Sequence, residues 1–255
     1  MAKKGSYWQK HKASQGEGGA EHSVKKIYTP INETLKLSFE TGKVLLIDKP
    51  LHWTSFDVVR KIRNAIQIKK VGHAGTLDPL ATGLLIVCTG KFTKQINEYM
   101  AQEKEYTGTF TLGAVTPTYD LESQLEQFKD IASITPQQVQ AATEAFIGTI
   151  QQIPPIYSAI KKKGTPLYEL ARRGEEVDLQ PRTIFIKSFE IVSIDFPIVH
   201  FRIVCSTGTY IRSIAHDFGA QLGCGAYLSS LRRTRIGTFE ISDAQNLDVF
   251  LASIR

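Results

Sequence analysis

A single carboxylate, Asp78, stands in a turn of small residues and has clear potential for chemistry. The segment GHAGTLDPLATGLL, residues 72–85, places Asp78 between a glycine-containing bend and an apolar run. Pro79 disfavours helix at Asp78 and holds its backbone extended, and the nearby glycines allow a backbone or a ligand to approach closely. The commonest use of an aspartate before proline is to cap a turn. The surrounding sequence offers no second acid, so any chemistry here would depend on one carboxylate.

Arg212 is a cation in an unfavourable place. The apolar spacing of YIRSIAHDFGAQLG, residues 210–223, predicts a helix with Arg212 in its first turn. The N-terminal end of a helix dipole is positive, so a cation there is disfavoured. Either the side chain reaches back to solvent, or an anion holds it. If that anion is Asp78, the arginine would keep the carboxylate ionised and oriented.

Two aromatic side chains could contact a planar substrate. Tyr106 begins the alternating segment YTGTFTLG, residues 106–113, and shares its apolar face with Phe110 and Leu112. This pattern favours a core aromatic with its hydroxyl group at the rim. His73 lies in the glycine-rich turn before Asp78, where it is either an ordinary loop residue or a side chain that stacks on bases.

Several classes of cofactor site have no counterpart in the sequence. There is no P-loop, no dinucleotide-binding motif and no G-x-S-x-G segment. The six histidines and three cysteines show no metal-ligand spacing. Cys88, Cys205 and Cys224 are well separated, which favours small buried side chains in a reducing compartment. We therefore expect acid chemistry without a metal or a cofactor.

The composition is that of a soluble globular protein. Of the 255 residues 42% are hydrophobic and 22% are charged, and no apolar run approaches the roughly 20 residues that span a bilayer. The net charge of +6 is uneven, because residues 1–28 hold six lysines against two glutamates. A polyanion site in the remainder must therefore be a local patch. Two clusters are candidates, although such clusters are usually solvated surface: Lys161–Lys163 with Arg172 and Arg173, and Arg232 with Arg233 and Arg235.

The order of expected elements indicates an α+β fold, because helices and strands mix without regular alternation. Residues 1–28 have the composition of a disordered basic tail. Thr54 or Ser55 can cap the first expected helix. Strands are expected at 43–50, 84–88, 106–113, twice within 183–205 and at 231–241, and helices at 56–66, from 136 to about 147, at 210–222 and near 247–254.

Six motifs, in order over residues 43–239, resemble the TruB-type tRNA pseudouridine synthases. That resemblance implies a pseudouridine synthase α+β fold, with a central, largely antiparallel mixed sheet, flanking helices and an RNA-binding cleft. It also implies a cytoplasmic isomerase that acts without a cofactor on uridine-55 in the T loop of tRNA, with the T-arm as its partner, no membrane, and a monomer as the default state. The motifs are GKVLLIDKPLHWTSFDVV, VGHAGTLDPLATGLL, KEYTGTFTLG, PPIYSAIKKKGTPLYELARRG, CSTGTYIRSIAHDFG and LRRTRIGTF.

The resemblance also implies roles for individual residues. Asp78 falls on the catalytic aspartate of the family, Tyr106 on its active-site tyrosine and Arg212 on the arginine that pairs with the aspartate. His73 falls on the histidine that contacts RNA near the flipped base. Tyr210 and Leu231 match residues that pack on the uracil, and Lys49, Lys161, Tyr168 and Arg172 fall in motifs that contact RNA or line the site.

The expected domain organisation follows from the same resemblance. Residues 29–255 would form the catalytic domain, with a thumb-like RNA-binding insertion at about 146–174. Few residues follow Phe239, so we expect no C-terminal PUA domain. The basic tail, residues 1–28, could replace part of the RNA contacts that such a domain makes.

Three other functions are weighed against this one. A glycosidase or nucleoside hydrolase usually requires two acids flanking the bond. An RNA-binding or RNA-folding protein would not need Asp78, Tyr106 and Arg212 together. A guide-RNA-dependent member of the same superfamily would carry an extra C-terminal domain. The mechanism itself stays open between attack of Asp78 at C1′, attack at C6, and a glycal route by deprotonation at C2′.

Overall fold

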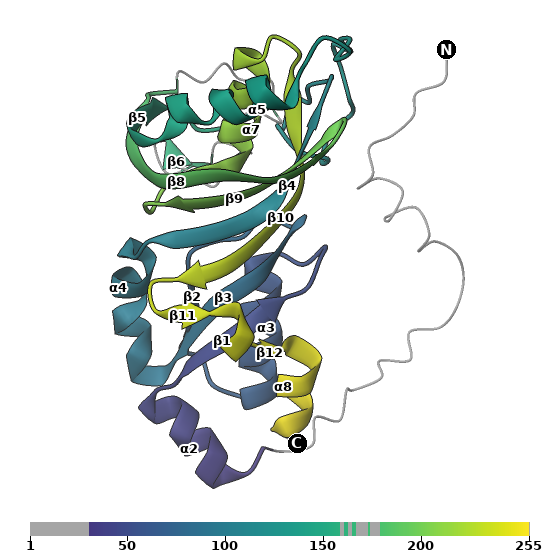
Figure 1. The fold of residues 1–255 in the computed structure, drawn as a ribbon. Coiled ribbons are helices and arrows are strands. Elements are labelled where there is room, and N and C mark those ends of the chain that lie inside the picture. The colour runs from purple at the N-terminus through teal and green to yellow at the C-terminus, as the bar shows by residue number, and fades with distance from the viewer. Residues whose placement is uncertain (1–30, 159–160, 163–164, 167–172, 174–178, 255) are drawn as a thin grey trace, which may run out of the picture. The chain divides into compact units, whose positions relative to one another are not determined.

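The computed structural model contains one long mixed sheet flanked by helices (Figure 1). The structure describes residues 31–158, 161–162, 165–166, 173 and 179–254, so the expected tail at 1–28 lies outside it. The helices are α2 (Glu33–Thr41), α3 (Ser55–Ile66), α4 (Ile96–Ala101), α5 (Pro136–Ala142), α7 (Ile211–Gln221) and α8 (Leu247–Ser253), with 3-10 turns η1 (Gly90–Gln95), η2 (Glu144–Phe146) and η3 (Ile241–Asp243). The strands are β1 (Val44–Lys49), β2 (Val71–Ala74), β3 (Ala81–Thr89), β4 (Lys104–Leu112), β5 (Gly148–Gln152), β6 (Lys161–Lys162), β7 (Thr165–Pro166), β8 (Arg182–Asp195), β9 (Ile198–Cys205), β10 (Ala226–Ile236), β11 (Phe239–Glu240) and β12 (Gln245–Asn246).

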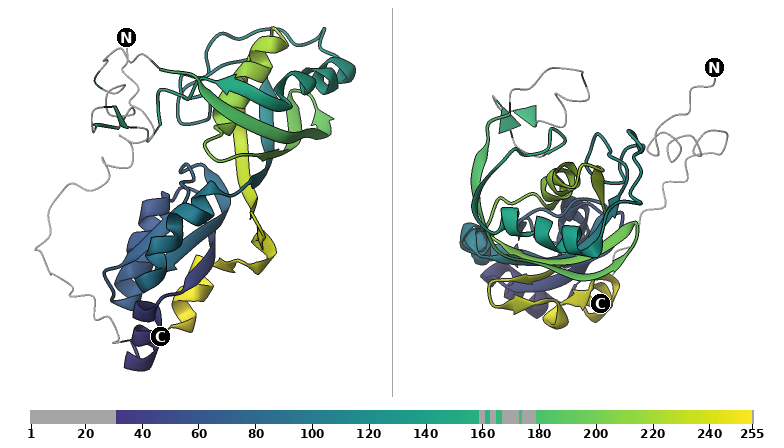
Figure 2. Two further views of the ribbon diagram at one scale, coloured as in Figure 1. Left: turned by 90° about the vertical axis from the view of Figure 1, so that its left-hand side faces the viewer. Right: turned by 45° about the horizontal axis from the view of Figure 1, so that its top comes forward.

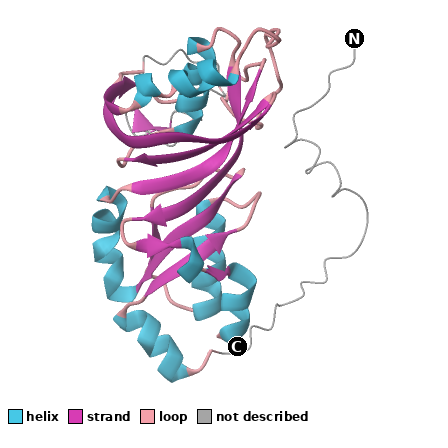
Figure 3. Cartoon of the chain, viewed as in Figure 1, coloured by secondary structure: helices cyan, strands magenta, loops and turns pink. Residues whose placement is uncertain are grey.

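The main sheet is largely antiparallel, as expected. Its strand order is β12-β1-β3-β10-β4-β9-β8-β5, with β2 paired to β3 and β11 paired to β10. Only the β1–β12 and β3–β10 pairs are parallel among the described strands. The prediction of an α+β fold is confirmed, because helices and a mostly antiparallel sheet occupy separate layers (Figure 3).

Helices cover the sheet in two regions. In one, α5 and α7 pack on β4, β8, β9 and β10 around an aromatic core that includes Phe110 and Phe218, and β8 and β9 curve around these helices (Figure 2). In the other, β3 is buried on both faces. Leu85 and Val87 pack against α3 and α8, while Leu84, Ile86 and Cys88 face the opposite side toward α4. A strand buried on both faces has no polar alternation, which explains the continuous apolar run after Asp78.

The ends of α3 and α7 agree with the expected signals. Thr54 caps α3 in a capping box with Asp57, whose backbone N–H donates to the Thr54 hydroxyl at 3.0 Å. Gly223 follows α7 with φ +77°, a conformation that favours glycine after a helix.

Some local expectations were wrong. The helix expected from 136 to about 147 stops at Ala142, and a 3-10 turn, η2, follows. The hydroxyl of Thr143 donates to the Gln140 carbonyl at 2.8 Å and the Thr143 N–H donates to the same carbonyl, which tightens this end of the helix. Residues 148–152 of the expected thumb-like insertion pair with β8 in the main sheet, so the segment that leaves this sheet begins after Gln152.

Candidate active site

Asp78 lies in the turn that joins β2 to β3, and neighbouring segments fix this turn on both sides. The buried hydroxyl of Ser55, the first residue of α3, accepts from the Leu77 N–H at 2.9 Å and donates to the Leu77 carbonyl at 3.2 Å. The Ala81 N–H donates to the Asp78 carbonyl at 3.0 Å. The Asp78 side chain is 36% exposed, so the carboxylate is held by its backbone yet open to a ligand.

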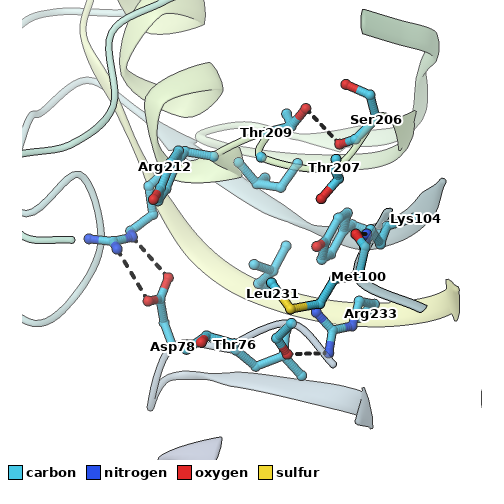
Figure 4. A pocket seen from close by; sticks show the side chains of 16 residues that line it. Thr76, Asp78, Met100, Lys104, Ser206, Thr207, Thr209, Arg212, Leu231 and Arg233 are labelled. Atoms are coloured by element: carbon cyan, nitrogen blue, oxygen red, sulfur yellow. Dashed lines mark hydrogen bonds and ion pairs between the residues drawn. The ribbon is translucent and has the colours of Figure 1, made fainter. Parts of the chain in front are cut away.

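Arg212 forms an ion pair with Asp78 (Figure 4). Its Nε lies 2.9 Å from Asp78 Oδ2, and its Nη2 donates to Asp78 Oδ1 at 3.2 Å. Backbone carbonyls of Thr118 and Tyr157 accept its other N–H groups at 3.2 and 3.1 Å. The anion expected to hold an arginine in the first turn of α7 is therefore Asp78.

Asp120 is a second carboxylate at this site, and sequence reasoning missed it. Its side chain is buried, and its Oδ2 lies 3.7 Å from Arg212 Nε. Burial raises the pKa of Asp120, and the charge of Arg212 opposes that shift. Burial alone would lower the pKa of Arg212, but Asp78 and Asp120 more than offset it. The expectation that no second acid accompanies Asp78 was wrong, because the Arg212 guanidinium contacts both carboxylates.

A cavity of about 260 Å³ opens beside Asp78. Four of the residues implied by the family resemblance, Tyr106, Tyr210, Arg212 and Leu231, line it together with the loop at 206–209. Its floor is the β4–β10 ladder, in which Tyr106 and Arg233 are directly opposite. Burial raises the pKa of the Tyr106 phenol, and the positive charge of Arg233 opposes that shift.

Lys49 does not line this cavity. Its side chain is 0% exposed, and its Nζ donates to the carbonyls of Pro50 at 3.0 Å, Trp53 at 2.5 Å and Pro79 at 3.4 Å. Burial lowers its pKa to about 8, although the nearby Asp78 carboxylate acts in the opposite direction. The expected direct contact of Lys49 with RNA is therefore incompatible with its position. It ties the end of β1 to the residue after Asp78.

Comparison with known proteins places this geometry in a family. The model for the N-terminal domain of TruB family pseudouridylate synthases matches residues 63–211, and the model of the tRNA pseudouridylate synthase B C-terminal domain matches residues 212–255. The chain belongs to the TruB family. The resemblance inferred from the six motifs is confirmed, and the protein is an isomerase of the pseudouridine synthase class.

Relatives of the TruB family match most of the chain. A protein of Flavobacterium johnsoniae named tRNA pseudouridine synthase B is 50% identical over 221 residues, which cover 84% of this chain and 96% of the relative. The protein of the same name from Parabacteroides distasonis is 48% identical over 224 residues, covering 84% and 95%.

Solved structures show the same fold in larger assemblies. A chain from a crystal structure of a Cbf5–Nop10–Gar1 complex superimposes with a TM-score of 0.67 at 30% identity, covering 86% of this chain and 56% of that one. A chain from an H/ACA RNP bound to a substrate RNA containing 2′-deoxyuridine gives a TM-score of 0.64 at 27% identity, covering 85% and 54%. The present chain thus spans just over half the length of these structural neighbours.

Of the remaining residues implied by the TruB resemblance, His73 is described in full and does not line the cavity. His73 lies in β2 rather than in a turn, and its Nδ1 is buried without a hydrogen-bond partner. Burial lowers the pKa of His73, and the charge of Arg233 adds to that effect. Lys161 lies in β6, which pairs with β7, while Tyr168 and Arg172 lie outside the described residues.

Two charged lining residues, Lys104 and Arg233, were not predicted as active-site residues, although Arg233 belongs to one of the two basic clusters named as candidate polyanion sites. A signal for both was present. Lys104 is two positions before Tyr106, and Arg233 two positions after Leu231, so each lies on the same face of its strand as a predicted site residue. Charged residues on that face of a central strand are unusual enough to indicate function.

Proposed function

We propose that this protein converts uridine-55 in the T loop of tRNA to pseudouridine. The observation that carries the proposal is the Asp78–Arg212 ion pair at the edge of a cavity that Tyr106 also lines. Two TruB-family relatives that match 84% of this chain are named tRNA pseudouridine synthase B, which supports tRNA as the substrate.

The target base must leave its stack before it can reach Asp78. A base within a folded loop is inaccessible to a cavity of this kind, so the nucleotide is flipped out, at a cost of a few kcal/mol. The Tyr106 ring can stack on the flipped uracil, and His73 faces the RNA loop from β2. The thumb-like segment after Gln152 and the T-arm would complete the contact.

Asp78 is the group that acts on the sugar or the base. Its carboxylate can attack C1′ or C6, or take the proton from C2′ in a glycal route. Arg212 keeps the carboxylate ionised and aimed in each case, because it makes two contacts to it. The reaction replaces an N1–C1′ bond by a C5–C1′ bond, so it needs no nucleotide or redox cofactor.

Asp120 does not turn this site into that of a hydrolase. Two-acid glycosidases need a second carboxylate that touches the leaving group or a water molecule. Asp120 is buried, its Oδ2 lies 3.7 Å from Arg212 Nε, and its Oδ1 accepts from the Glu122 N–H at 3.0 Å. It therefore orients the arginine rather than activating water.

A guide-RNA-dependent enzyme is the second candidate, because the described fold matches chains of box H/ACA assemblies. The relatives favour an enzyme that acts on tRNA by itself, since the Flavobacterium protein, which is 50% identical, is named tRNA pseudouridine synthase B. The proposal includes action as a monomer in the cytoplasm. No helix in the described residues is long and apolar enough to cross a membrane.

The deciding experiment uses unmodified tRNA and no guide RNA. The purified full-length chain is incubated with the transcript, and pseudouridine is mapped by chemical derivatisation and primer extension. We expect one modified position, uridine-55, and none with Asp78→Ala, which should still bind the tRNA. Modification at another position, dependence on an added guide RNA, or turnover by Asp78→Ala would contradict the proposal.

A further inference from the structure

Two buried cations line the cavity without a carboxylate partner. Lys104 is 5% exposed and Arg233 is 1% exposed. Among the described residues, no carboxylate oxygen lies within 4.0 Å of either charged group. Figure 4 shows both on the side of the cavity away from the Asp78–Arg212 pair. The cavity thus has a paired acid at one end and unneutralised positive charge at the other.

Backbone carbonyls hold these two cations in place. Lys104 Nζ donates to the carbonyls of Met100 and Gln102, the latter at 2.6 Å. Arg233 Nε donates to the Leu84 carbonyl at 2.8 Å, and its Nη2 donates to the Gly75 carbonyl at 3.1 Å. Carbonyls orient a cation but do not cancel its charge, so the positive field in the cavity remains.

Keeping this charge buried costs stability. A cation removed from water is unfavourable unless an anion compensates it. Burial, and then the charge of Arg233, lower the pKa of Lys104 to about 8. A structural role in this place could be filled by an apolar or neutral side chain at lower cost. The two cations therefore point to a ligand that is negative when it occupies the cavity.

Two of the three routes, attack at C1′ and the glycal route, generate such a ligand. When the N1–C1′ bond breaks, its electron pair stays on the base and leaves a uracil anion whose charge is shared by N1, O2 and O4. Asp78 balances the positive charge that develops at C1′. After the base turns, C5 donates an electron pair to C1′, C5 loses its proton and N1 gains one, so the product is an isomer of the substrate.

We propose that Lys104 and Arg233 form a subsite for the uracil anion, which stabilises the detached base and keeps it in the cavity while it turns. This inference rests on the proposed function. With C1′ at Asp78 and the ring on Tyr106, the carbonyl edge of the base points toward Lys104 and Arg233. The charge appears only as the bond breaks, so the two cations bind the transition state more tightly than the substrate.

The test varies the stability of the anion itself. Single-turnover cleavage is measured for tRNA carrying uridine or 5-fluorouridine at position 55, because fluorine at C5 stabilises the anion without help from the protein. The main variant is Lys104→Gln, whose amide can still donate to the Met100 and Gln102 carbonyls. We expect it to slow cleavage of uridine by about 10²–10³-fold, the usual effect of losing one charge-stabilising donor. For 5-fluorouridine the loss should be about tenfold smaller, because a better leaving group needs less assistance.

Three controls separate this role from a structural one. Lys61→Gln makes the same change on the exposed surface of α3 and should leave both rates unchanged. Lys104→Arg keeps the charge and should be faster than Lys104→Gln. The tRNA affinity of Lys104→Gln should equal that of the wild type, which verifies folding. If the affinity falls, the cleavage rates of uridine and 5-fluorouridine are compared in Lys104→Met instead.

The outcomes distinguish the two levels of the proposal. An equal loss of rate with both bases, or a Lys104→Gln variant as fast as the wild type, overturns the subsite and leaves the proposed function intact. A wild-type protein that does not modify tRNA contradicts the proposed function, and the subsite with it.

Discussion

The carboxylate of Asp120 contacts the Arg212 guanidinium at 3.7 Å, although 92 positions separate them in the sequence. Both Asp120 and Asp78 approach the same atom, Arg212 Nε, but Asp120 is buried and only Asp78 lines the cavity beside Tyr106. Asp120 thus restrains the arginine that holds Asp78.

Replacing Asp120 by asparagine should slow catalysis without weakening RNA binding. The amide side chain would keep the shape but remove the charge that restrains Arg212, and a small displacement of a catalytic group can cost about 10²-fold in rate. We expect kcat of Asp120→Asn to fall by that amount, with the Kd for tRNA unchanged because the residue is buried. Single-turnover kinetics and filter binding measure the two quantities. Glu126→Gln, an exposed change in the same loop, is the control, and a wild-type kcat for Asp120→Asn would exclude the restraint.

Tyr106→Phe tests whether the buried hydroxyl takes part in proton transfer. The ring remains, so stacking and KM should be unchanged. The Tyr106 side chain lines the cavity, and loss of a group that moves a proton typically costs about 10²–10⁴-fold in kcat. The matched control is Tyr99→Phe, because the Tyr99 hydroxyl bonds to Gln95 at 3.0 Å outside the cavity lining. A Tyr106→Phe variant with the kcat of Tyr99→Phe would limit Tyr106 to stacking.

Local patterns in the sequence predict most of this fold, because they come from short-range physics. The capping box at Thr54, the alternation from Tyr106 to Leu112 and the apolar face of α7 each appear within a few residues. The helix α2 was not predicted, since among its residues only Phe39 is buried and its apolar pattern is weak. The early end of α5 depends on side-chain hydrogen bonds at Thr143, which propensity does not indicate.

The site was predictable only in part, because its members come from distant segments. An arginine at the start of α7 indicates a missing anion, and this signal led to Asp78. Asp120 gives no such signal, since the loop that carries it meets Arg212 only in the folded chain. Lys49 shows the opposite error. A lysine in a functional motif suggested RNA contact. Its Nζ instead donates to two carbonyls nearby in the chain, those of Pro50 and Trp53, and to the Pro79 carbonyl, which only folding brings close.

Ser55→Ala should weaken both stability and catalysis. The Ser55 hydroxyl satisfies the N–H and the carbonyl of Leu77, the residue before Asp78, at a buried position. Buried groups left without partners cost about 1–3 kcal/mol, so the free energy of unfolding in urea should fall by that amount. A decrease in kcat should accompany it, because the Asp78 turn loses its anchor. The control is Ser253→Ala, which removes a hydrogen bond from the Ser253 hydroxyl to the Phe250 carbonyl at 2.8 Å within α8. This bond does not involve the Asp78 turn, so kcat should not change. Equal kcat in the two variants would show that the hydrogen bonds from Ser55 to Leu77 do not position Asp78 for catalysis.

Gly83→Ala should destabilise the protein through the contact between β3 and β10. Gly83 has φ +102°, and a Cβ there would lie 2.3 Å from the Arg233 carbonyl oxygen and 2.7 Å from its backbone nitrogen. Neither backbone atom can rotate away, so β10 must shift and the bond from Arg233 to the Leu84 carbonyl must lengthen. Strain at positive φ and overpacking each cost about 1–3 kcal/mol.

The control for Gly83→Ala shares its strain but not its clash. Gly223 has φ +77°, and a Cβ at that position meets nothing within 4 Å. The difference between the unfolding free energies of Gly83→Ala and Gly223→Ala therefore isolates the steric cost of approaching β10, and we expect about 1–3 kcal/mol. Because the displaced strand carries Arg233, Gly83→Ala should also lower kcat, while Gly223→Ala should not. If both variants lost the same stability, β3 and β10 could separate without cost, and the close approach at Gly83 would not be what positions Arg233.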